Sequence, residues 1–135
     1  CGDTECSPEY LDGFVSVQGN NDMYYDFPKR LVIELEGLRI LVMHGDRIPP
    51  MQLKDRLTEY ANAEDCQLMC YGHSHIFSVE EKNGVTLVNP GSIYHNRDFT
   101  LPSYAIITYE NGLFSIERGA IDEVKEKKKG FFSRF

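Results

Sequence analysis

Three of the four histidines in this 135-residue sequence stand where an apolar, strand-like run ends. His44 follows the run at 38–43, and both His73 and His75 follow the run at 67–71. A strand end that feeds a loop is where α/β proteins place ligand-binding groups. Neutral imidazole together with carboxylate suits Mn²⁺, Fe²⁺, Zn²⁺ or Ni²⁺ better than Ca²⁺. The pattern therefore predicts a transition-metal site built from loops.

The small residues Gly72 and Ser74 permit a tight turn in which the imidazoles on either side of Ser74 converge. Asp3 and Asn20 occupy similar strand-to-loop positions and can add oxygen ligands. A lone histidine is more often a satisfied surface or core residue, and we keep that interpretation for His95. The shared position of the other three histidines favours a metal site.

The bulk composition, 41% apolar and 26% charged, is typical of one ordinary globular domain. No apolar run reaches the roughly 18 residues that cross a bilayer, and no leader opens the chain, so we expect a cytoplasmic protein. A net charge of −7 argues against nucleic-acid binding, because phosphate contacts need a basic surface. An acidic protein can still bind a small phosphate ester if bound metal supplies positive charge.

A β-rich pattern with one clear helix must position these loops. Apolar periodicity and turn residues predict a strand at 14–17, a hairpin of 31–35 with 38–43, a helix at 51–63, a strand at 67–71, and two Asn-Gly hairpins, 76–81 with 85–88 and 104–109 with 113–117. We expect one domain over 1–122 and a basic, Phe-containing tail over 123–135. The tail is interpreted as solvated and partly disordered, with a weak contact to an anionic membrane or partner as the alternative. All four cysteines are expected to be free thiols, since no C-x-x-C pair is present.

Ordered motifs make residues 1 to about 118 resemble the calcineurin-like metallophosphoesterase superfamily, and its small bacterial and archaeal phosphodiesterase branch in particular. The motifs are Gly2-Asp3, Gly19-Asn20-Asn21-Asp22, His44-Gly45 and Gly72-His73-Ser74-His75, with Asn89-Pro90-Gly91-Ser92 and Arg97 as further features of the branch. The resemblance implies an α/β fold of two facing sheets flanked by helices (αββα), N-terminally incomplete, with the metal loops along one edge.

The resemblance also implies a role for each motif residue. Asp3 would bridge two metal ions, Asn20, His44 and His73 would complete the shell of one, and His75 would bind the other. The family's second metal also takes an Asp-x-His motif that this sequence lacks. We therefore expect a natural protein that is longer at its N-terminus, weak or no activity in this chain, and an empty central position in its sheet. Such a chain would belong to a larger protein or pair with a second copy.

The implied activity is hydrolysis of phosphodiesters, with monoesters as an alternative, by a hydroxide that bridges two metals. Mn²⁺ is the expected metal, with Fe²⁺, Zn²⁺ or Ni²⁺ as alternatives. Two other functions stay open: a non-catalytic interaction scaffold on the same fold, and a structural metal-binding domain without phosphate chemistry.

Four further residues are candidates for catalysis. Asn21 stands where many members have a His that helps to protonate the leaving group, so the position is compatible with the branch but offers no general acid. Asp22 is either an orienting group or a turn residue. Arg97 either binds a phosphate oxygen through its planar donor fork or forms a surface ion pair. His95, in the same loop, is a weaker candidate for protonating the leaving group.

Overall fold

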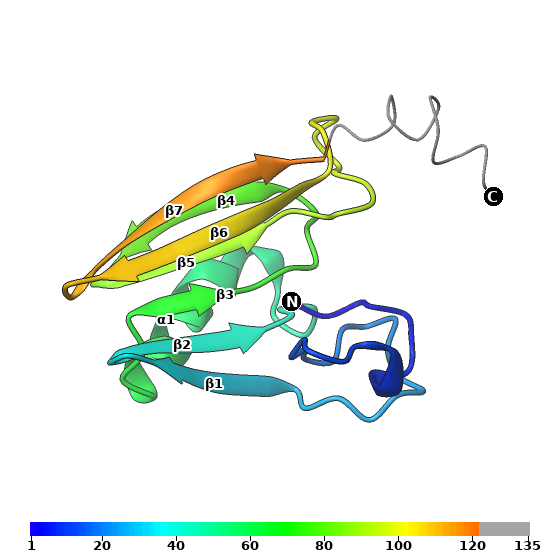
Figure 1. The fold of residues 1–135 in the computed structure, drawn as a ribbon, viewed down its shortest axis with the longest axis horizontal. Coiled ribbons are helices and arrows are strands. Elements are labelled where there is room, and N and C mark those ends of the chain that lie inside the picture. Colours follow the sequence, from blue (N-terminus) through cyan, green and yellow to red (C-terminus); the bar gives the residue numbers. More distant parts are fainter. Residues whose placement is uncertain (122–135) are drawn as a thin grey trace.

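A computed structural model describes residues 1–121 of the chain, which form three layers: a helix, a five-stranded sheet and a two-stranded sheet (Figure 1). The strands are β1 Arg30–Leu35, β2 Leu38–Met43, β3 Leu68–Cys70, β4 Phe77–Lys82, β5 Val85–Pro90, β6 Ser103–Glu110 and β7 Leu113–Ala120. The helices are α1 Leu53–Ala63 and two 3₁₀ turns, η1 Pro8–Tyr10 and η2 Pro50–Gln52. The larger sheet has the order β1-β2-β3-β5-β4, and β6 and β7 make the smaller one.

Two-residue turns explain the three hairpins of the fold. Glu36-Gly37, Asn83-Gly84 and Asn111-Gly112 connect β1 to β2, β4 to β5 and β6 to β7, and all six residues have a positive φ. Turns of this kind match the right-handed twist of the flanking strands, which is why Asn-Gly is so strong a hairpin signal. The three predicted hairpins are confirmed.

The central strands of the larger sheet, β2, β3 and β5, are covered on both faces. On one face, α1 packs Leu57 and Ala61 against a core that includes Leu41 and Met69. On the other face, Leu68 and its neighbours contact the alternating apolar residues of β6 and β7. The α/β class with two facing sheets is confirmed, and in residues 1–121 the covering helical layer is α1 on one outer face.

Two expectations about strands are wrong. Residues 14–17 form no strand, and although Val17 is fully buried, Phe14 and Val15 are 78% and 73% exposed. β-Branched and aromatic residues favour a strand only where a neighbouring strand pairs with them, and here none does. The central sheet position is not empty either, because the five described strands pair without a gap.

Three further expectations concern the cysteines, membrane-spanning helices and the C-terminal tail. All four cysteines lie among the described residues, and all four are free thiols, as predicted. Within residues 1–121, no helix combines the length and the apolar character that crossing a membrane would need. The predicted tail at 123–135 lies outside the described residues.

The parallel strands β2, β3 and β5 direct their carboxyl ends toward the same end of the molecule, where the N-terminus and the loops of residues 1–29 also lie (Figure 1). The loops that follow these strands begin at His44, Tyr71 and Gly91. The fold therefore gathers most of the predicted site residues at one sheet edge, the usual place for ligands in α/β proteins.

Candidate metal centre

His44 is delivered by the carboxyl end of β2 and is almost fully buried. Its Nδ1 lies 2.8 Å from the carbonyl oxygen of Cys1, and because a carbonyl can only accept, Nδ1 carries the hydrogen. Burial lowers the pKa of His44, against the opposing effect of the Asp3 carboxylate, so the neutral imidazole is favoured. The remaining nitrogen, Nε2, then presents a lone pair, which is the form of histidine that binds metals.

Two oxygen atoms face that lone pair. Nε2 of His44 lies 3.1 Å from Oδ2 of Asp3 and 3.0 Å from Oδ1 of Asn20. With Nε2 unprotonated, no hydrogen lies between these atoms, so three electron-rich atoms meet without a donor. Spacings near 3 Å are those of neighbouring ligands around one ion with bonds of about 2.1 Å. The donor set fits a divalent transition metal.

His73 completes this group. Its Nδ1 lies 3.2 Å from the same Asn20 oxygen, and its ring packs edge-on against His44 with centroids 5.1 Å apart. The potential ligand atoms of Asp3, His44 and His73 all lie within 4.8 Å of one another. The structure therefore brings together Asp3, Asn20, His44 and His73.

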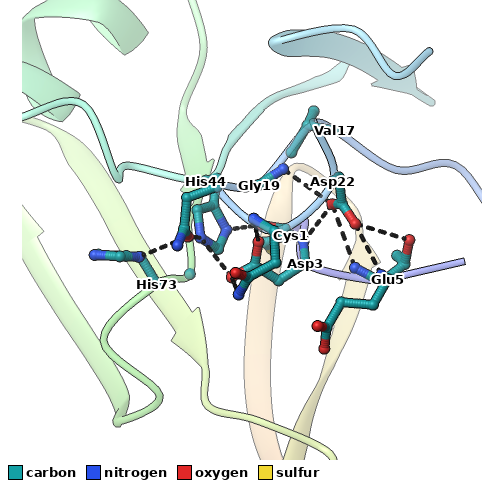
Figure 2. Close-up of polar contacts among 12 residues, drawn as sticks. Cys1, Asp3, Glu5, Val17, Gly19, Asp22, His44 and His73 are labelled. Carbon is teal, nitrogen blue, oxygen red and sulfur yellow. Dashed lines mark hydrogen bonds and ion pairs between the residues drawn. The ribbon is translucent and has the colours of Figure 1, made fainter. Parts of the chain in front are cut away.

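A buried carboxylate, Asp22, joins the two loops that carry Asp3 and Asn20 (Figure 2). Its Oδ2 accepts the backbone N–H of Asp3 at 2.6 Å and of Gly19 at 3.0 Å, while Oδ1 accepts that of Glu5 at 2.8 Å. Burial raises the pKa of Asp22, but these backbone donors outweigh it and hold the pKa below its usual value. Asp22 thus fixes the two loops against each other.

Close packing around Asp3 depends on a glycine. A Cβ atom on Gly19 would lie 2.0 Å from Oδ1 of Asp3, so no larger residue fits at this position without displacing the carboxylate. Asn21 adds two hydrogen bonds to the same carboxylate, from its backbone N–H at 2.8 Å and from its Nδ2 at 3.3 Å. Asn21 therefore contacts Asp3, one of the proposed ligands.

The turn at residues 72–75 separates its two histidines. The N–H of Ser74 donates to the carbonyl of Gly72 at 2.9 Å across His73, whose φ of 70° makes this a strained γ-turn. Asn89, buried at the end of β5, donates to Gly72 O and to Ser74 Oγ and so braces the turn. His75 lies outside the group formed by Asp3, His44 and His73. Its pKa is lowered by burial, and the nearby Arg97 guanidinium lowers it further.

A second buried side chain, Asn96, organises the loop between β5 and β6. Its Oδ1 accepts the N–H of Ser92 at 2.6 Å, and its Nδ2 lies within 3.2 Å of Thr100 Oγ1, Leu101 O and Ser103 Oγ. Its neighbours His95 and Arg97 are both exposed. The Arg97 N–H donates to His75 O at 3.0 Å, and Arg97 forms no ion pair within residues 1–121. Neither side chain joins the ligand group around His44.

Sequence reasoning gave no role to Asn96, and it noted Asn89 only as part of the Asn89-Pro90-Gly91-Ser92 motif, without its buried hydrogen bonds. Both are buried amides whose partners lie elsewhere in the chain, and an amide in a loop carries no local sign of that burial. The one available signal was position, since Asn89 stands next to the end of a buried strand and Asn96 stands between two candidate residues.

Comparison with known proteins gives consistent matches. A family model described as the calcineurin-like phosphoesterase superfamily domain matches residues 1–112. The chain is 37% identical over 115 residues to a probable metallophosphoesterase of Bacillus subtilis, YsnB, covering 82% of this chain and 67% of that protein.

Two solved structures extend the comparison. The crystal structure of an uncharacterised protein of Streptococcus pneumoniae, a predicted phosphoesterase, superposes with a TM-score of 0.82 at 30% identity, covering 88% of this chain and 70% of that chain. Wild-type Vps29 of Entamoeba histolytica in complex with Zn²⁺ superposes with a TM-score of 0.63 at 20% identity, covering 85% and 77% of the two chains. The second likeness is one of fold alone.

Proposed function

The chain belongs to the calcineurin-like phosphoesterase superfamily, and on that premise we propose that it carries the metal site of a metal-dependent phosphodiesterase. The observation that supports this most strongly is that Asp3 Oδ2 and Asn20 Oδ1 lie 3.1 and 3.0 Å from His44 Nε2 without a hydrogen on that nitrogen. Three lone pairs directed at one another repel unless a cation lies between them. A structural ion pair would need a protonated His44, which burial disfavours.

In this proposal Asp3, Asn20, His44 and His73 hold one divalent metal, and Asp3 and His75 contribute to a second. Bound metal ions of this kind offset the charge of the phosphate and lower the pKa of water enough to supply a nucleophile at neutral pH. Cys1 O keeps the His44 ring oriented by accepting its Nδ1 hydrogen. Asp22 holds the loop of Asp3 against the loop of Asn20 by accepting backbone hydrogen bonds from Asp3 and Gly19.

The loop that follows β5 supplies the remaining proposed roles. Arg97 binds a phosphate oxygen, because its guanidinium is exposed and its backbone is tied to His75. His95, an exposed residue of the same loop, is the weaker candidate for protonating the leaving group. Asn21 supports the Asp3 carboxylate instead of acting as an acid.

The metal is Mn²⁺, with Fe²⁺, Zn²⁺ or Ni²⁺ as alternatives, and the substrate is a small phosphodiester and not a nucleic acid, in keeping with a net charge of −7. The resemblance implies that the second site also takes ligands from an Asp-x-His motif, which residues 1–135 do not contain. A cytoplasmic location completes the proposal.

Hydrolysis of bis(4-nitrophenyl) phosphate by the full-length protein tests it, with 4-nitrophenyl phosphate as the monoester comparison. We expect turnover of the diester with Mn²⁺, none after chelation, and a loss of at least about 100-fold in His73→Ala. Metal-dependent turnover that is unchanged in His73→Ala would overturn the site assignment. A protein that binds Mn²⁺ but hydrolyses neither ester would instead favour the non-catalytic scaffold.

A further inference from the structure

A cavity of about 380 Å³ opens directly beside the candidate metal centre. Asn20 and His44 form part of its wall, so any molecule in the cavity lies next to two of the proposed ligands. Neither His95 nor Arg97 lines it. The cavity is therefore a space adjoining the metal site that the roles described so far do not use.

The wall of this cavity is largely apolar. Met43 comes from the end of β2, Ile48 from the loop after it and Tyr60 from α1, and all three are half-buried against the main core. This part of the wall therefore rests on the core that lies between α1 and the larger sheet. Met23 adds an apolar side chain that is 71% exposed. An apolar recess beside a few polar groups is the usual form of a site for a small organic ligand.

Charged residues on the same cavity favour an anionic ligand. Lys29 and Arg47 line it together with one acid, Asp46, which leaves a surplus of positive charge in a chain whose net charge is −7. Neither Lys29 nor Arg47 forms an ion pair with any of residues 1–121. Both cations are therefore available to a bound ligand.

We propose that this cavity binds the organic group of the phosphodiester and so selects esters whose retained group is apolar and about the size of one aromatic ring. The inference rests on the proposed function, because the metal centre fixes the phosphate beside Asn20 and His44. The volume lies at the lower end of the range for small-molecule sites, which suits one such group and not a polymer. Lys29 and Arg47 attract the ester's negative charge to the cavity.

Two substrates that share a leaving group separate the cavity from the metal chemistry: 4-nitrophenyl phenyl phosphate and 4-nitrophenyl methyl phosphate. We expect the full-length protein to prefer the phenyl ester by about tenfold in kcat/KM, since burying the ring adds apolar contact. Met23→Gln and Ile48→Gln should reduce this preference to about twofold. Met51→Gln is the matched control, because Met51 is 98% exposed and does not line the cavity.

Equal rates for both esters in the wild-type protein would overturn the cavity proposal while leaving the proposed function intact. If neither ester is hydrolysed, the proposed function fails, and the cavity is then tested by binding of phenyl phosphate against methyl phosphate. Tighter binding of phenyl phosphate by about tenfold, lost in Met23→Gln, would support the cavity, and equal binding would reject it. Met23 is so exposed that this variant should fold normally.

The charged residues are tested separately. The double variant Lys29→Ala, Arg47→Ala should lower kcat/KM for both esters by about fivefold at low salt and by less at high salt, because screening weakens the attraction. Arg56→Ala, which removes an exposed cation of α1, is the control and should change neither rate. An equal loss in the control and the double variant would show that Lys29 and Arg47 have no special role.

Discussion

Two loop regions flank the carboxyl ends of the parallel strands, and each is built around one buried polar side chain. Asp22 fixes residues 1–5 against residues 19–22, and Asn96 fixes residues 92–103. Around Asp22 the neighbouring side chains converge on a shared point, whereas around Asn96 the neighbouring candidates are exposed. In both regions, therefore, one buried polar side chain fixes the backbone conformation of the loop through its hydrogen bonds. A convergent ligand set also needs side chains from other elements, here His44 and His73.

Of the substitutions that test the difference between these two loop regions, Asp22→Ala should have the largest effect on stability and on metal binding. Removal of the buried carboxylate leaves the backbone N–H groups of Asp3, Glu5 and Gly19 without their acceptor, and each lost hydrogen bond to this charged group costs about 1 kcal/mol or more. We expect a loss of about 3 kcal/mol in the free energy of unfolding, measured with urea, together with loss of tight Mn²⁺ binding. Wild-type Mn²⁺ affinity in this variant would mean that Asp22 does not position the ligands.

Asn96→Ala should destabilise the protein but leave the metal centre intact. The amide satisfies the N–H of Ser92 and donates to Leu101 O and Ser103 Oγ, so its loss should cost about 2 kcal/mol of unfolding free energy. Mn²⁺ affinity should stay within about twofold of wild type. Asn62→Ala, an exposed amide on α1, is the control with little expected effect. A large loss of Mn²⁺ affinity in Asn96→Ala would remove the distinction between the two regions.

Arg97→Ala should lower kcat/KM for a phosphodiester by about tenfold, which corresponds to about 1.4 kcal/mol. The reason is the loss of a planar donor fork that can bind two phosphate oxygens. Arg97→Lys should recover only part of the rate, because lysine keeps the charge but not the fork. Unchanged kinetics in Arg97→Ala would return Arg97 to the role of a surface residue.

His95→Ala should have the smallest effect, less than about threefold on kcat. The side chain is exposed and makes no contact with the ligand group, so a nitrophenolate leaving group, which needs little protonation, should leave at nearly the same rate. Parallel assays with an alkyl leaving group, which does need a proton, should show a larger loss. A 100-fold loss with the nitrophenyl ester would make His95 a central residue and contradict this ranking.

Local signals in the sequence were enough to predict the hairpins and the strand ends that are followed by His44 and His73. An Asn-Gly turn acts through its own two residues, so no distant contact is needed to predict it. The prediction of a strand at 14–17 was wrong because a strand needs a neighbouring strand to pair with, and residues 14–17 carry no information about that partner. The buried roles of Asn89 and Asn96 could not be predicted for the same reason, since their hydrogen-bond partners become neighbours only in the fold.

The candidate site shows the same division between local and distant information. Two roles were left open for Asp22: an orienting group or a turn residue. An orienting group would accept hydrogen bonds from another loop, and the Asp22 carboxylate accepts them from the backbone of Asp3 and Glu5. The strained turn at His73 could be expected from Gly72 and Ser74, but the tautomer of His44 could not. That tautomer follows from a contact with Cys1, 43 residues away in the sequence.

Binding of Mn²⁺ to the full-length protein, followed by electron paramagnetic resonance, tests the central claim most directly. If Asp3, Asn20, His44 and His73 hold one ion, His44→Ala should weaken one Mn²⁺ equivalent by at least about 100-fold. His73→Ala, which alters a less buried residue, should do the same without unfolding the protein. An unchanged Mn²⁺ isotherm in both folded variants would contradict the assignment.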